Sequence, residues 1–154
     1  MKSIYKISIV LLLCLFTVLL AGCFGDGEVY SAAGKTYVYS SCTVDIPEGA
    51  DSTIVSEANK MLNDRKRTDE GMKVSFNEDM TAVYTYADGS SKTFTKYVQV
   101  GKQVLILNGP NAATTYEGET YTGWNVEGDN LVLVSKFTYD GTMITITETV
   151  TLEK

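Results

Sequence analysis

The 154-residue sequence contains no histidine, and this absence excludes several kinds of functional site. Histidine is the commonest protein metal ligand and general base, so Ser/His and Cys/His nucleophilic arrangements are excluded with it. Beyond residue 22 the chain also lacks an S-x-x-K segment, a G-x-S-x-G segment and a glycine-rich phosphate loop. We therefore expect a protein that is not an enzyme, with no catalytic residue, no metal ion and no cofactor.

Paired carboxylates are the only groups left for acid–base chemistry. Glu117 with Glu119 and Asp69 with Glu70 are such pairs, and all four residues fall in predicted turns. We interpret them as solvated loop acids. The Asp-Gly pairs of the chain lack the spacing of an EF-hand loop, so they indicate hairpin turns rather than calcium sites.

Basic residues are scarce, with 13 lysines and arginines against 19 acids. Lys2 and Lys6 lie in a segment of 22 residues that is predicted to be removed, so the mature charge is 11 − 19 = −8. Binding to nucleic acid requires a basic patch against the phosphates, and we expect none here. A negative domain attracts basic partners instead, so a basic envelope protein is one possible partner.

The N-terminus has the layout of an export signal. Two lysines precede the uncharged and almost wholly apolar run 7–20, which is shorter than the roughly 20 residues of a membrane span. Leu20, Ala21, Gly22 and Cys23 then resemble the lipobox of bacterial lipoproteins. The resemblance implies cleavage before Cys23 and lipid attachment to its thiol. The alternative is an ordinary secretory signal that is followed by an incidental cysteine.

Lipidation would tether the protein to a membrane that it does not cross. Two acyl chains anchor a protein stably because each buried CH₂ contributes about 0.8 kcal/mol. We expect a signal peptide over 1–22, a lipidated N-terminus and tether over 23–34, and one domain over 35–154. The location is the bacterial cell envelope, on the extracytoplasmic side of a membrane. Which membrane this is, and the oligomeric state, stay open.

Cysteine is almost absent from the mature chain. Cys14 lies in the removed segment and Cys23 would carry lipid, which leaves Cys42 without a partner for a disulfide. There is no C-x-x-C motif, so zinc and redox sites have no support. Cys42 alternates with Val38 and Val44, and we expect it to be a small buried hydrophobic residue.

Short β-type runs separated by turn residues predict an all-β domain. Asp88-Gly89 and Asp140-Gly141 are typical of tight hairpin turns, so the strands are expected to be antiparallel. In the last run, alternate residues from Ile144 to Leu152 form an apolar row that Glu148 interrupts. The eight predicted strands are 36–44, 72–77, 81–87, 93–100, 103–107, 121–126, 131–139 and 142–152.

One segment, 51–66, has helical rather than alternating periodicity. Its apolar residues recur at a spacing of three and four, Asp51 or Ser52 can serve as the N-cap, and Gly71 follows its end. The basic run 65–67 complements the helix dipole. We interpret this run as a solvated helix end, not as an anion site.

Three hairpins, over 74–82, 124–131 and 137–153, resemble those of bacterial lipocalin-like lipoproteins of the calycin type. The resemblance, together with the strand count, implies an eight-stranded antiparallel up-and-down β-barrel. One amphipathic helix would be inserted between the first and second strands.

A barrel of eight strands is either filled by side chains or holds one small ligand. We expect a non-enzymatic binding module that holds a small apolar ligand. Its candidate ligand-binding residues are Tyr37, Tyr84, Tyr86, Trp124, Phe137 and Glu148. The alternative is a filled barrel in which these aromatic residues pack, and whose outer surface binds an envelope protein or a cell-wall polymer as an inhibitor or interaction protein.

Overall fold

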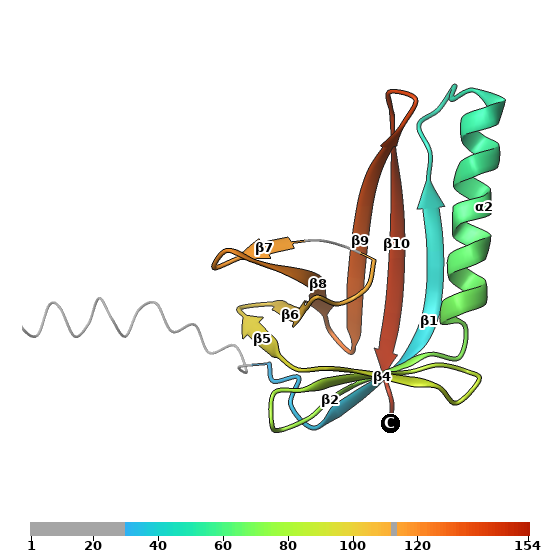
Figure 1. Cartoon of the computed structure of the whole chain (residues 1–154). Coiled ribbons are helices and arrows are strands. Elements are labelled where there is room, and N and C mark those ends of the chain that lie inside the picture. Colours follow the sequence, from blue (N-terminus) through green and yellow to red (C-terminus); the bar gives the residue numbers. More distant parts are fainter. Residues whose placement is uncertain (1–29, 112–113) are drawn as a thin grey trace, which may run out of the picture. The chain divides into compact units, whose positions relative to one another are not determined.

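A computed structural model describes residues 30–111 and 114–154 of the chain. The predicted signal peptide and Cys23 therefore lie outside the described residues. Ser31–Lys154 form one unit of strands and a single helix, shown in Figure 1. The elements are β1 (Lys35–Asp45), α2 (Ser52–Asp69), β2 (Lys73–Phe76), β3 (Ala82–Thr85), β4 (Ser91–Phe94), β5 (Tyr97–Val100), β6 (Gln103–Leu107), β7 (Thr114–Tyr116), β8 (Glu119–Glu127), β9 (Asn130–Tyr139) and β10 (Thr142–Leu152).

The strands form a single antiparallel sheet. Their hydrogen-bonded order is β4-β3-β2-β1-β10-β9-β8-β6-β5, and β7 pairs with β8 outside this path. A mostly antiparallel β domain with one helix after the first strand is thus confirmed. The eight-stranded closed barrel is not confirmed, because the sheet has ten strands and its ladder does not close.

The predicted strand 93–100 is two strands, and this is one source of the difference in number. β4 pairs with β3 and β5 pairs with β6, so the two strands form opposite edges of the sheet although only two residues separate them. One backbone bond joins β5 to the turn between β2 and β3, from the Tyr97 N–H to the Met80 carbonyl at 2.8 Å. The sheet therefore curls until β5 lies against this turn, and the described strands β4 and β5 form no ladder with each other.

β7 is the second unexpected strand. It joins β8 through Glu117 and Gly118, whose φ angles are 49° and 81°. Two consecutive positive φ angles are characteristic of the type I′ turn, which matches the twist of a hairpin. Asp140 and Gly141 make the same kind of turn between β9 and β10, with φ angles of 44° and 76°, as the sequence predicts.

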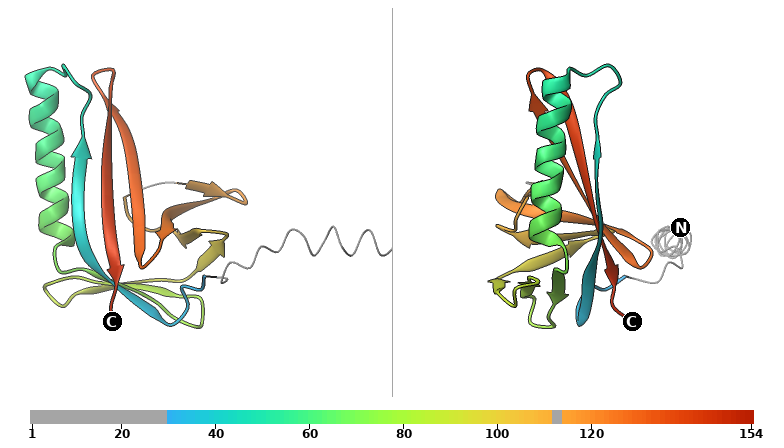
Figure 2. Two further views of the ribbon diagram at one scale, coloured as in Figure 1. Left: turned by 180° about the vertical axis from the view of Figure 1, so that it is seen from behind. Right: turned by 90° about the vertical axis from the view of Figure 1, so that its right-hand side faces the viewer.

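The long strands β1, β10 and β9 lie side by side, and α2 runs along them (Figures 1 and 2). Ile54 and Ala58 of α2 are buried against Ile144 of β10. The helix is confirmed, and its N-cap is Asp51, whose carboxylate accepts a hydrogen bond from the Thr53 N–H at 2.7 Å. It extends three residues further than predicted, to Asp69. Among the described residues no helix is long and apolar enough to cross a membrane.

Aromatic side chains fill the interior where the short strands meet the long ones. Phe76 makes edge-to-face contacts with Tyr37 and Tyr97, at centroid distances of 5.9 and 5.0 Å. Cys42 is 3% exposed, which confirms it as a small buried residue. Ala32, in the segment predicted to be a tether, is also buried, and its N–H bonds to the Gln99 side chain.

Candidate functional site

The structure does not gather the six predicted ligand-binding residues into one cavity. Tyr37, Tyr84 and Trp124 are each 1% exposed and belong to the packed core. The Trp124 Nε1–H donates a hydrogen bond to the Tyr84 hydroxyl at 3.0 Å, which satisfies the indole donor without a ligand. Tyr86 and Phe137 are half-buried and line two different cavities.

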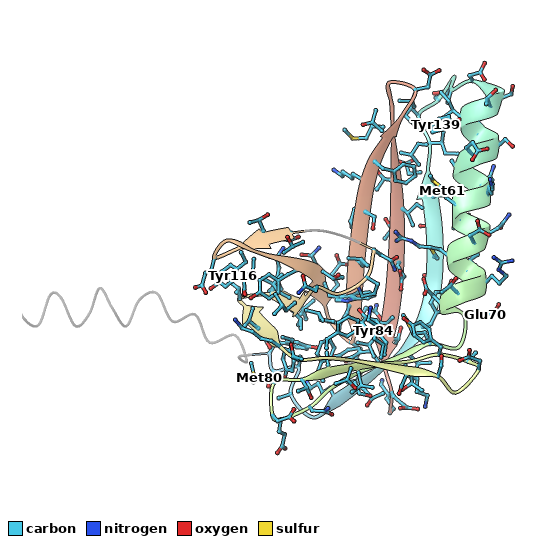
Figure 3. The ribbon with its side chains drawn as sticks, in the orientation of Figure 1. Met61, Glu70, Met80, Tyr84, Tyr116 and Tyr139 are labelled. Carbon is cyan, nitrogen blue, oxygen red and sulfur yellow. The ribbon has the colours of Figure 1, made fainter. Side chains whose placement is uncertain are left out.

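One of these cavities, of about 380 Å³, lies between α2 and the sheet. Figure 3 shows Met61 on the side of α2 that faces the strands. The residues that line the cavity are Met61, Asp64, Arg65, Thr68 and Asp69 of α2, Phe137 of β9, Ile146 of β10, and Asn111.

Helical spacing explains why five residues of α2 line one cavity. Positions 61, 64, 65, 68 and 69 recur at intervals of three and four, so their side chains lie on one face of the helix. The neighbouring strands contribute only apolar groups, Phe137 and Ile146. The cavity consequently has an apolar side, formed by these two residues and Met61, and a polar side that the C-terminal half of α2 provides.

Glu148 lies behind Arg65, beneath the C-terminal half of the helix. It is two residues beyond Ile146 on the same face of β10, and it is completely buried between Cys42 of β1 and Leu133 of β9. Its Oε2 lies 3.8 Å from Nη1 of Arg65, and neither carboxylate oxygen has a hydrogen-bond partner among the residues that the structure describes.

Burial determines the protonation of Glu148. Loss of hydration and the nearby Asp69 carboxylate raise its pKa to about 7, and the guanidinium of Arg65 opposes them only in part. The Arg65 side chain also donates a hydrogen bond to the Ser135 hydroxyl at 3.2 Å. Attraction to the guanidinium does not offset the cost of burying this carboxylate.

Asp69 is a second buried acid in the same place. It is the last residue of α2 and is 4% exposed. Burial raises the pKa of its carboxyl group, and Arg65 again acts in the opposite direction. Two buried carboxylates therefore share one guanidinium, and this region can carry an excess of negative charge.

Two sequence interpretations are wrong at this site. Asp69 is not a solvated loop acid, and the Arg65 side chain is only 18% exposed, so it is not part of a solvated helix end. The sequence does contain a signal for the burial of Arg65 and Asp69. If the helix is extended to residue 69, both positions lie on the same face as Ile54, Ala58 and Met61. The other three acids of the two pairs, Glu70, Glu117 and Glu119, are exposed as predicted.

A second cavity, of about 400 Å³, lies beside the turn between β3 and β4. Tyr86 lines it together with Arg67, Thr68 and Asp88, and its other lining residues are small. The Asp88 carboxylate accepts a hydrogen bond from the Ser90 N–H at 2.8 Å, which is an ordinary turn contact. This lining offers little apolar surface to a ligand.

Over residues 30–111 and 114–154, no group of three cysteine, aspartate or glutamate side chains could hold a metal ion. Comparison of the chain with protein-family models, curated proteins and solved structures finds no match.

Proposed function

We propose that this protein is a lipid-anchored, extracytoplasmic binding protein that holds one small, mainly apolar molecule in the cavity beneath α2. The observation that carries the proposal is the cavity of about 380 Å³, in which Met61, Phe137 and Ile146 face five polar or charged side chains. Protein ligand sites typically have roughly 300–1,000 Å³, an apolar lining and few polar groups. The volume of the cavity lies in this range, and its three apolar residues form one side, while five polar or charged residues make the rest of the lining more polar than is typical.

The family that we propose is that of the bacterial lipocalin-like lipoproteins, with a filled barrel. Tyr37, Tyr84 and Trp124 occupy the interior in which such a protein would hold its ligand. The curled sheet then acts as a scaffold, and the ligand lies under the helix, on the face of β10 that carries Ile146. Cys23 provides the anchor at the envelope membrane.

The proposal predicts that filling the cavity abolishes binding. Thr68 is exposed and lines both this cavity and the second one, so Thr68→Trp places an indole ring where the two cavities adjoin without disturbing the core. The full chain, purified from membranes in lipid nanodiscs, would be examined by native mass spectrometry. We expect one additional small-molecule mass on the natural protein and its loss in the variant.

Thr53→Trp is the matched control, because Thr53 lies on the same helix, is exposed, and does not line the cavity. It should retain the additional mass. A natural protein that carries only its polypeptide and acyl anchor, also after exposure to envelope extract, would contradict the proposal. So would equal loss of the mass in both variants.

A second candidate function is the binding of an envelope protein or cell-wall polymer through the outer surface. Val134 and Met143, on the face of β9 and β10 opposite α2, are 39% and 56% exposed, which is unusual for apolar residues of central strands. Binding of a purified basic partner that Val134→Asp abolishes and Thr68→Trp leaves intact would favour this alternative.

A further inference from the structure

The polar side of the cavity is richer in carboxylates than in cations. Asp64, Arg65 and Asp69 line it, and Glu148 lies directly behind Arg65. Asp64 is exposed and already pairs with Arg67 on the helix surface, at 3.2 Å. Arg65 is thus the one basic residue of the lining, and it faces Asp69 and Glu148 together.

Arg65 is turned toward the sheet. Its Nη1 donates a hydrogen bond to the Ser135 hydroxyl and lies 3.8 Å from the Glu148 carboxylate. The guanidinium therefore interacts with two residues that lie behind the cavity lining. Asp69 is 4% exposed and lines the cavity. The positive charge beside it is that of Arg65, which already interacts with Ser135 and Glu148.

Hydrogen-bond donors are also lacking behind Arg65, at Glu148, which does not itself line the cavity. Within the described part of the chain, both carboxylate oxygens of Glu148 are buried without a hydrogen-bond partner, although the side chain is fully enclosed. Buried polar groups normally have partners, so Glu148 competes with Asp69 for the guanidinium of Arg65. Positive charge and N–H donors placed against Asp69, which lines the cavity, relieve this competition.

We propose that the bound molecule is a small amphiphilic amine. Its protonated amino group lies against Asp69, and its apolar body lies against Met61, Phe137 and Ile146. An ammonium group supplies one positive charge and up to three donors, so Arg65 can turn further toward Glu148. A carboxylate ligand would instead meet the excess of negative charge. This inference rests on the proposed function, because it specifies the ligand of the same cavity.

Three probes of similar size test this inference: 2-phenylethylamine and 2-phenylethanol share a phenylethyl body, and phenylacetate carries the same phenyl ring and one methylene on a carboxylate. Their binding to the full chain in nanodiscs would be measured by calorimetry at pH 7, with empty nanodiscs as the reference. We expect the amine to bind at least tenfold more tightly than the alcohol, and phenylacetate to bind most weakly.

Asp69→Asn should lower the affinity for the amine about tenfold and leave that for the alcohol unchanged. Asp64→Asn changes an exposed residue of the same lining and should lower the affinity for the amine less than Asp69→Asn does. It provides a second test if the Asp69 variant does not fold. Asp45→Asn is the control, since it makes the same charge change at an exposed site outside the cavity.

The outcomes separate this inference from the proposed function. Equal binding of amine and alcohol, or an amine preference that persists in both lining variants, overturns the inference and leaves the binding cavity in place. Preferential binding of phenylacetate also overturns it, because Arg65 would then be the recognition group. No binding of any probe overturns both proposals.

Discussion

Burial of the Glu148 carboxylate in its charged form lowers the stability of the folded protein. Glu148 occupies an apolar row of β10, and its pKa is raised from 4.5 to about 7. An acid whose pKa is higher in the folded state binds its proton more tightly there than in the unfolded chain. Its contribution to stability is therefore fully present below about pH 4.5 and is lost as the pH rises through 7. Asp69, whose pKa is also raised, acts in the same direction.

Glu148→Gln tests this linkage, because glutamine has the same shape and no charge. We expect the variant to be more stable than the natural protein at pH 8, by about 1–3 kcal/mol in the free energy of unfolding. The difference should shrink toward zero at pH 5, where Glu148 is already protonated. Urea denaturation at the two pH values measures both quantities.

Glu127→Gln, at an exposed end of β8, controls for the loss of a surface charge and should have little effect at either pH. If Glu148→Gln destabilises the protein by the same amount at pH 5 and pH 8, then the Arg65–Glu148 ion pair stabilises the fold. That result would contradict the account of a costly buried carboxylate.

At the residue scale, the sequence indicates that Glu148 is unusual, but it does not predict which residues surround Glu148. The interruption of the alternating row is visible in the one-letter code. The residues around Glu148 are distant from it in the chain, by between 13 and 83 positions for Arg65, Ser135 and Asp69. They lie near Glu148 only because α2 packs against β9 and β10. No local pattern encodes such a contact.

At the scale of elements, packing of α2 on the long strands determines whether the cavity exists. Ile144 is completely buried against Ile54 and Ala58 of the helix. Ile144→Ala should lower the free energy of unfolding by about 2–4 kcal/mol, because it removes buried apolar contacts and leaves a void. Thermal or urea unfolding measures the effect.

Met143→Ala is the adjacent control on the opposite face of the same strand. Met143 is 56% exposed, so its truncation should change stability by no more than about 0.5 kcal/mol. Equal effects of the two variants would show that α2 does not pack on this face of the sheet as described.

Most elements can be predicted because their signals are local. The helix follows from its cap and apolar spacing, and the last hairpin follows from Asp140-Gly141 and the alternation on both sides of it. The division of 93–100 cannot be predicted in this way. Its two halves have the same strand character, and the break arises because they pair with opposite edges of the sheet.

At the scale of the whole molecule, the anchor and the cavity together define the proposed role. Cys23→Ala removes the thiol of the proposed lipobox, so we expect acylation to stop. We expect no incorporation of radiolabelled palmitate, and release of the protein from the membrane fraction. Cys42→Ala is the control and should leave both unchanged, since Cys42 is buried. Firm membrane association of the Cys23 variant would contradict the anchor.

Whether the cavity under α2 binds a small molecule can be observed directly by methyl NMR of the full chain in nanodiscs during addition of 2-phenylethylamine. Met61 and Ile146 line the cavity, and Met143 lies on the opposite face of β10 as an internal reference. The account predicts saturable shifts of the Met61 and Ile146 methyl signals while that of Met143 stays in place. Unchanged signals at the two cavity residues, or equal shifts at all three, would contradict it.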